Sequence, residues 1–140
     1  MRVIARSRFY HDGRGPELLQ VHLSPHSANL VAIDYSPPDF DGNAVGVGHL
    51  RFLKAQVHMF TPEEVENYEL SEPNWASTEN GALVSLGRTA WLGSFAQRHL
   101  GHCEHFRAMF YDQLLDVICE GVSAEEGPFD PVPKRPGDAA

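Results

Sequence analysis

Histidine and cysteine side chains gather in one short stretch in the second half of the chain, and they are the residues best suited to chemistry. The stretch contains His99, His102, Cys103 and His105, whose nitrogen and sulfur atoms are ligands that zinc accepts. Their spacing matches no standard zinc motif, and His99 and His102 share a helix face only if the helix runs through Gly101. Histidines at a helix C-terminus, where positive charge is favoured, explain the same pattern. We therefore expect no metal here, and keep a small metal-dependent enzyme built on these four side chains as an alternative.

Other catalytic patterns in the sequence are weaker. His11 and Asp12 pair a base with a carboxylate, but neighbours on an extended chain point to opposite faces, and Asp12-Gly13 is a common turn pair. The glycines around Gly46 lack the Lys-Ser/Thr ending of a phosphate loop, and no serine lies in a nucleophile elbow. The sequence therefore favours a protein with no catalytic residue and no cofactor.

The charge balance and the absence of long apolar runs narrow the classes of partner. Eleven Lys and Arg stand against 19 Asp and Glu, which gives a formal net charge of −8 with His neutral. A nucleic-acid binder needs a basic surface, so nucleic acid is excluded as a partner. No stretch approaches the ~18 apolar residues of a membrane span. The two cysteines, Cys103 and Cys119, form no Cys-x-x-Cys pair, which favours a reduced, cytoplasmic protein.

Acidic residues concentrate in a region that has no Lys or Arg between Gln56 and Leu83. Such a region steers a basic partner by electrostatic attraction, and Trp75 within it is a residue type that often anchors an interface. The alternative is a solvated helix face, with the tryptophan acting as a lid over the core of the domain. We predict that the following residues bind a protein partner: Glu63, Glu64, Glu66, Glu69, Glu72 and Trp75, with Glu79 in the same region.

The first expected element is a strand at 17–23, where apolar and polar residues alternate. Leu19, Val21 and Leu23 share one face, which the alternation predicts to be buried. A second strand is expected at 30–35, after a short polar connection. Strands this close in sequence pair antiparallel, because a parallel crossover needs a dozen or more residues.

The middle of the chain predicts an extended segment at about 45–60, followed by a helix. The apolar positions change phase near Leu53, which is typical of a β-bulge or of two short strands joined by a bend. Thr61 is a suitable helix cap and Pro62 suits the first helical position, so a short helix is expected to begin here.

The second half predicts a strand at 82–86 and a helix at 91–100 that Gly101 terminates. Residues 106–119 fit either one helix or two strands joined by a turn at 112–113. The long run without an internal cap favours two strands.

The expected fold class is α+β, a mainly antiparallel β-sheet of about five or six strands with one or two short helices packed on one face. Residues 1–126 are expected to form a single compact domain, and 127–140 a Pro-rich mobile tail. The expected core comprises Leu19, Val21, Leu23, Val31, Ile33, Phe52, Val57, Phe95, Phe106, Phe110, Val117 and Ile118.

Two short motifs suggest a family. Phe9-Tyr10-His11-Asp12-Gly13 precedes the first hairpin, and Phe110-Tyr111-Asp112 precedes Leu115-Asp116-Val117-Ile118. Over residues 9–122 the chain resembles the small bacterial immunity proteins, which are encoded beside polymorphic toxins. The resemblance implies a non-enzymatic toxin inhibitor that blocks a basic toxin domain through an acidic surface. The protein is expected to be a monomer or a homodimer. A different alternative is an oligomeric interaction domain whose sheet edge pairs with itself.

Overall fold

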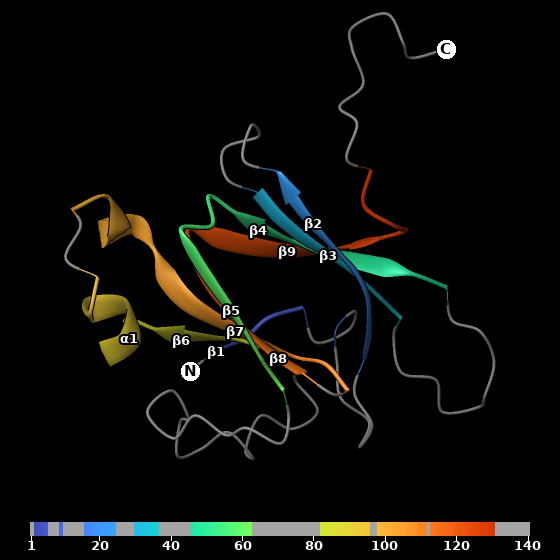
Figure 1. Ribbon diagram of the computed structural model, residues 1–140, viewed down its shortest axis with the longest axis horizontal. Helices are drawn as coiled ribbons and strands as arrows, with labels where there is room; N and C mark the ends of the chain where they lie inside the picture. The colour runs from blue at the N-terminus through green and yellow to red at the C-terminus, as the bar shows by residue number, and fades with distance from the viewer. Residues whose placement is uncertain are drawn as a thin grey trace, which may run out of the picture.

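Two antiparallel sheets form the structure, a computed structural model that describes residues 2–5, 9, 16–24, 30–36, 46–62, 82–95, 98–111 and 113–130 (Figure 1). The five-stranded sheet has the order β1 (Arg2–Val3), β6 (Leu83–Gly87), β7 (Glu104–Met109), β8 (Gln113–Cys119) and β5 (Val57–Pro62). The four-stranded sheet has the order β2 (Glu17–Ser24), β3 (Leu30–Ser36), β4 (Gly48–Leu53) and β9 (Gly121–Glu126). The mainly antiparallel character is therefore confirmed, but the strands divide between two sheets instead of forming one.

The two sheets are joined at a corner where two strands pass from one sheet into the other. β4 continues into β5 through residues 54–56, and β8 continues into β9 through Glu120. Leu53 pairs with Gly121 and Val57 with Ile118, so one side of the corner has one residue more than the other. That extra residue defines a bulge, and Lys54 sits in it with a left-handed φ of 53°. The phase change near Leu53 therefore marks a bulge that is also the bend between two short strands.

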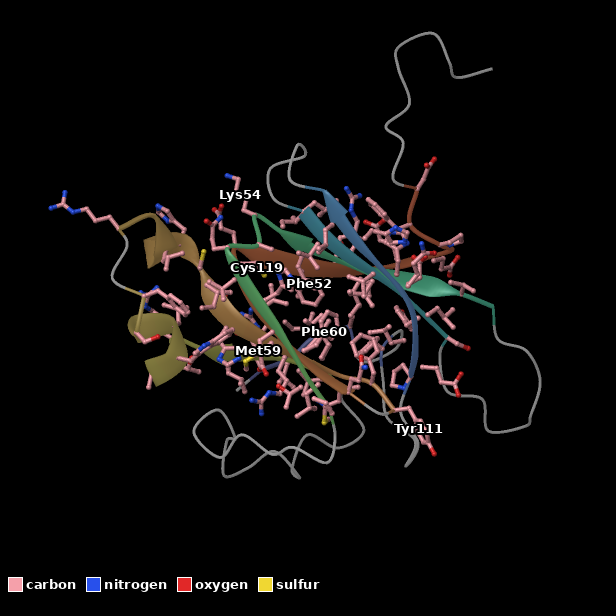
Figure 2. All side chains as sticks on the ribbon, in the orientation of Figure 1. Phe52, Lys54, Met59, Phe60, Tyr111 and Cys119 are labelled. Atoms are coloured by element: carbon pink, nitrogen blue, oxygen red, sulfur yellow. The ribbon has the colours of Figure 1, made fainter. Side chains whose placement is uncertain are left out.

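The main core lies between the inner faces of the two sheets. Phe9 packs edge-to-face on Tyr35 and on Phe110, with ring centroids 4.8 and 5.4 Å apart. Figure 2 shows Phe52 and Phe60 in this interior and Lys54 at the corner. Most of the expected core is confirmed as buried: Val31, Ile33, Phe52, Phe106, Phe110, Val117 and Ile118.

A second, smaller apolar cluster covers the other face of the five-stranded sheet. Ile118 alternates with the core residue Val117 and so points to this face, where it packs with Leu92, Leu100 and Cys103. Val57 and Phe95, which were expected in the core, are only partly buried and pack against the same cluster.

The expected helix at 91–100 is wrong in length. The α-helix α1 spans only Ala90–Gly93, and a separate 3-10 helix, η2, spans Arg98–His102 and contains the expected terminator Gly101. Gly93 is a poor helix former, and the Ser94 hydroxyl donates to the Trp91 carbonyl oxygen at 2.6 Å, which favours ending the helix at this turn.

The predicted helix start at Thr61 is also wrong, and the pair of strands predicted at 106–119 is correct. Thr61 and Pro62 are the last residues of β5 and pair with Leu114 and Gln113. A proline is tolerated at a strand end, where its missing N–H costs little. The rest of that expected helix lies outside the described residues. Residues 106–119 therefore form the paired strands β7 and β8 and not a single helix. The strand β9 was not predicted.

Residues 127–130 cross the outer face of the four-stranded sheet after β9. Gly127 has a φ of 79°, a left-handed turn that suits glycine. The Phe129 N–H donates to the Asp34 carboxylate at 2.7 Å, and its ring centroid lies 5.2 Å from that of His22. These residues contact the domain, although their proline content placed them in the expected mobile tail.

Candidate functional site

An edge strand with an uncovered apolar face is the first feature of interest. Within the described residues β2 pairs only with β3, so its other edge has no strand beside it. Leu19, Val21 and Leu23, which we expected in the core, are 50, 36 and 58% exposed. That prediction is therefore wrong for all three residues.

The pairing of β2 with β3 shows that Val21 and Leu23 lie on the predicted face of the sheet, although they are not buried. Val21 pairs with Ile33, and Leu23 pairs with Val31. Antiparallel partners point to the same side of a sheet, and Val31 and Ile33 both belong to the main core. Val21 and Leu23 therefore lie on the inner side, but the packing that buries β3 does not extend outward to the edge strand.

A bulge shifts the start of β2. Leu18 pairs with Tyr35 and Gln20 with Asp34, so Leu19 is the extra residue between them. Leu18 packs against the main core, whereas Leu19 is half exposed. From Gln20 to Ser24 the pairing is regular.

The composition of β2 leaves this edge open to pairing. Exposed edges are usually blunted by short length, lysine, proline or a β-bulge, and in β2 the bulge is confined to Leu19 near the start of the strand. β2 has eight residues and contains neither lysine nor proline, and Glu17 is its one residue among Asp, Glu, Lys and Arg. Such a strand is suited to accept the backbone of another extended segment.

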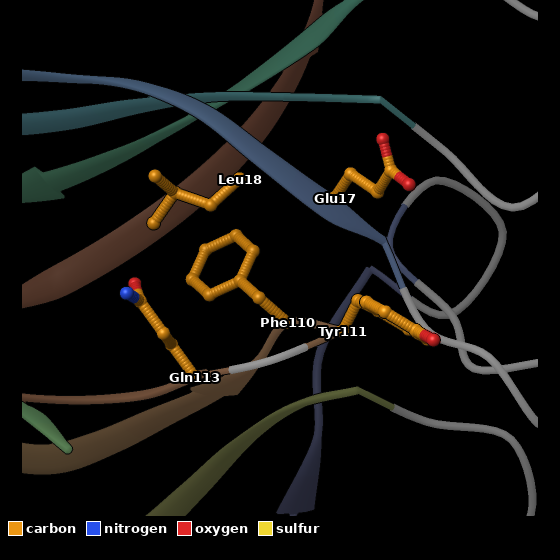
Figure 3. A pocket seen from close by; sticks show the side chains of 5 residues that line it. All are labelled: Glu17, Leu18, Phe110, Tyr111 and Gln113. Carbon is orange, nitrogen blue, oxygen red and sulfur yellow. The ribbon is translucent and has the colours of Figure 1, made fainter. Parts of the chain in front are cut away.

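A pocket of about 350 Å³ opens where β2 begins, beside the turn between β7 and β8. The Tyr111 N–H donates to the Pro16 carbonyl at 2.8 Å and holds that turn against the start of β2. Figure 3 shows the side chains that face the pocket, and Figure 2 shows Tyr111 at the end of the molecule far from Lys54. The lining is mixed, apolar and polar: Glu17, Leu18, Phe110, Tyr111 and Gln113.

Buried polar side chains form a network on the outer face of the five-stranded sheet. His105 lies between the Thr89 hydroxyl, 2.8 Å from Nδ1, and the Asp116 carboxylate, 2.6 Å from Nε2. The Arg107 Nε–H donates to the same carboxylate oxygen at 2.8 Å. The ring centroid of Trp91 lies 4.8 Å from that of His105. With the proton assigned to Nε2, Nδ1 accepts from the hydroxyl of Thr89.

The order hydroxyl, imidazole, carboxylate is that of a hydrolase triad, but the surroundings assign it a structural role. The Thr89 oxygen caps α1 by accepting from the Leu92 N–H at 3.3 Å. Arg107 neutralises the carboxylate that would support the imidazole, and the His105 side chain is fully buried. The network therefore fastens α1 to the sheet. The signal available in the sequence was the alternation that puts His105, Arg107 and Asp116 on one face of two paired strands.

The structure does not bring the described members of the histidine and cysteine stretch together. Both ring nitrogens of His105 are engaged in the network, His102 is exposed, and Cys103 belongs to the smaller apolar cluster. The side chain of His99 lies outside the described ones. Among the described residues no three His, Cys, Asp or Glu side chains are placed to hold a metal ion. The metal-dependent alternative therefore loses His105 as a ligand.

The predicted acidic partner surface lies outside the described residues, because 63–81 are not among them. Glu63, Glu64, Glu66, Glu69, Glu72 and Trp75 therefore stay predictions.

Both cysteines are buried and free. Burial raises the pKa of the Cys119 thiol to about 12, and the pKa of Cys103 is raised by burial and by Glu120 against the opposing charge of Arg88. Neither thiol is therefore an activated nucleophile.

Comparison of the chain with protein-family models, with curated proteins and with solved structures found no match. In the part of the chain that the structure describes, no helix is long and apolar enough to cross a membrane.

Proposed function

We propose that the protein is a non-enzymatic protein-binding domain whose docking element is the free edge of β2. The observation that carries the proposal is the exposure of Leu19, Val21 and Leu23 along a strand that has one neighbour within the described residues. Contiguous exposed apolar residues on a soluble domain mark an interaction surface.

The binding mode is addition of a strand. A segment of another polypeptide that lies along β2 hydrogen-bonds to the N–H and C=O groups that point away from β3, and these main-chain bonds supply affinity. Side chains of the added strand that point inward contact Val21 and Leu23 across the new ladder. The partner is therefore an extended segment with apolar residues at alternate positions, and the pocket beside Glu17 and Leu18 is placed to receive a side chain at its end.

The identity of a foreign partner follows from the resemblance to immunity proteins. On that basis the partner is a basic toxin domain encoded by a neighbouring gene, the fold class is the α+β of those proteins, and the protein works as an inhibitor in the bacterial cytoplasm, where its two thiols stay reduced. The net charge of −8 supports a basic partner. In this proposal the acidic residues at 63–72 and Trp75 form a further contact with the toxin, in addition to the strand that pairs with β2.

The experiment compares Val21→Lys with a matched control, Leu53→Lys, which changes an exposed leucine (45%) at the corner. Binding to the purified product of the neighbouring gene is measured by titration calorimetry, and self-association by sedimentation over a wide concentration range. Lysine at an edge opposes strand pairing, so Val21→Lys should weaken one or both associations by at least about tenfold. Leu53→Lys should leave both unchanged. If Val21→Lys changes neither association that the wild type shows, or if the wild type shows none, the edge is not a docking element and the proposal is wrong.

A further inference from the structure

The sequence of β2, the strand with the free edge, is self-complementary in antiparallel pairing. The residues from Leu19 to Leu23 read Leu, Gln, Val, His, Leu, so the sequence of chemical types is the same in both directions about Val21. In antiparallel pairing the two strands run in opposite directions, and a strand with this pattern matches a second copy of itself. We propose that the segment that pairs with β2 is β2 of a second copy, related by a two-fold axis through Val21. The inference rests on the proposed docking function of this edge.

In the pairing that this two-fold axis produces, apolar residues lie opposite apolar residues and polar residues lie opposite polar residues. Val21 lies opposite Val21 of the partner subunit, Leu19 lies opposite Leu23 of the partner subunit, and Gln20 lies opposite His22 of the partner subunit. Directly opposed residues share a face, with Cβ atoms about 5 Å apart. Val21 and Leu23 of each copy therefore lie on the inner side, where Val31 and Ile33 already lie, and Leu19 of each copy, the bulge residue, lies opposite Leu23 of the partner subunit.

Other registers lose one or more of these pairs. An axis through Gln20 places Leu23 opposite the charged Glu17, and an axis through His22 places Leu19 opposite residue 25, a proline that has no N–H for the ladder. An axis between two residues places the apolar side of one copy on the polar side of the other, because side chains alternate along a strand. Only the axis through Val21 opposes all three apolar residues with apolar residues.

Charge also favours a second copy in this register. Glu17 is the one formally charged residue of β2, and it falls at the end of the paired segment, where it faces no acidic side chain. Although each chain carries a net charge of −8, the paired strands themselves therefore bring no like charges together. The dimer joins the two four-stranded sheets into one continuous sheet and removes both free β2 edges.

The test is a charge exchange at the axis. Wild-type protein should sediment at twice the 15.6 kDa of the single chain, and both Val21→Lys and Val21→Glu should sediment as monomers, because each places like charges opposite each other. An equimolar mixture of Val21→Lys and Val21→Glu should recover the dimer, since opposite charges now face each other. Mixing Val21→Lys with Leu23→Glu should not, because residue 23 lies opposite residue 19 in this register. Leu53→Lys should remain dimeric.

A second pair of variants tests the register without changing Val21. Leu19→Glu and Leu23→Lys in the same chain should dimerise, because each glutamate meets a lysine of the other subunit, whereas Leu19→Glu alone should be monomeric. A wild type that is monomeric at every concentration, or a failure of both charge exchanges to recover the dimer, overturns the second-copy inference. If the second-copy inference fails in this way, the proposed docking function is still supported when Val21→Lys weakens binding of the neighbouring gene product. If that binding is unchanged, the proposed docking function is wrong as well.

Discussion

The ring of Tyr35 lies against the backbone of Gly48, its cross-strand partner in the four-stranded sheet. A Cβ atom at position 48 would lie 2.7 Å from both Cζ and the hydroxyl oxygen of Tyr35. The tyrosine is almost completely buried and is held edge-on by Phe9. The absence of a side chain at Gly48 is therefore what allows the largest side chain of β3 to enter the core.

Gly48→Ala should lower the free energy of unfolding by about 1–3 kcal/mol, because a tightly packed aromatic ring must move to admit the methyl group. Gly121→Ala is the matched control, since Gly121 is the first residue of β9 as Gly48 is the first residue of β4, and its Cβ would meet nothing within 4 Å. The control should be neutral or more stable by about 0.5 kcal/mol. Urea unfolding of the two variants and the wild type measures the difference, and equal stabilities would contradict the packing described for Tyr35.

The contact between Phe129 and the outer face of the four-stranded sheet should contribute to stability. A chain ending at Glu126 loses the hydrogen bond from the Phe129 N–H to Asp34, a bond to a charged acceptor, together with the ring contact on His22. We expect it to be less stable by about 1–3 kcal/mol. A chain ending at Asp130 keeps these contacts and should match the full chain. Thermal unfolding of the two truncated chains is the measurement, and indistinguishable transitions would show that Phe129 contributes nothing.

Asp116 should be among the residues least tolerant of substitution. Its carboxylate is buried and accepts from both His105 and Arg107. Asp116→Asn removes the negative charge and leaves the Arg107 guanidinium buried without it, which should cost about 3–5 kcal/mol of stability. Glu120→Gln is the control, because its ion pair with Lys54 is solvent-exposed and should be worth less than about 1 kcal/mol. Comparable losses for the two variants in urea unfolding would refute a structural role for the network.

Which strands form could be predicted better than where they lie in the sheets. The alternation correctly identifies the inward side of β2 at Val21 and Leu23, because side-chain direction has a period of two along a regular strand, but it misses the inward-packed Leu18 before the bulge. Whether that side is buried depends on the place of β2 at the outside of its sheet. That place is set by pairing with distant residues, which the alternation does not encode. The phase change near Leu53 is local, and so a bulge or bend there could be predicted, although the passage of the chain into a second sheet could not.

For the expected helix at Thr61 and for the polar network around His105, contacts with residues distant in the sequence override the local sequence pattern. Thr61 and Pro62 have the residue types of a helix start, yet they pair with β8 because β5 continues to the end of its partner. His105 was grouped with its neighbours in sequence as a metal ligand, whereas its contacts come from Thr89 and Asp116, at separations of 16 and 11 residues. Pairing between β7 and β8 creates that site: alternation within each strand puts these side chains on one face, and the register of the two strands brings them together.

The burial of Cys119 predicts a specific dependence of stability on alkaline pH. Burial, with smaller contributions from the charges of Cys103, Glu104 and Glu120, raises the pKa of its thiol from 9.0 to about 12. In the unfolded chain the thiol ionises near its ordinary pKa, so between about pH 9 and 12 the folded state holds a proton that the unfolded state has released. The stabilising contribution is therefore complete below pH 9 and is lost as the pH rises, by up to about 1.4 kcal/mol per pH unit. Because tyrosine and lysine titrate in the same range, the quantity to measure is the difference between wild type and Cys119→Ala in urea unfolding at several pH values. The wild type should lose stability more steeply than the variant above pH 9, and parallel profiles would show that the thiol is not protected in the folded protein.

As an independent check, the Cys119 thiol should react with a thiol reagent at pH 8 only as fast as the protein unfolds, since its side chain is fully buried.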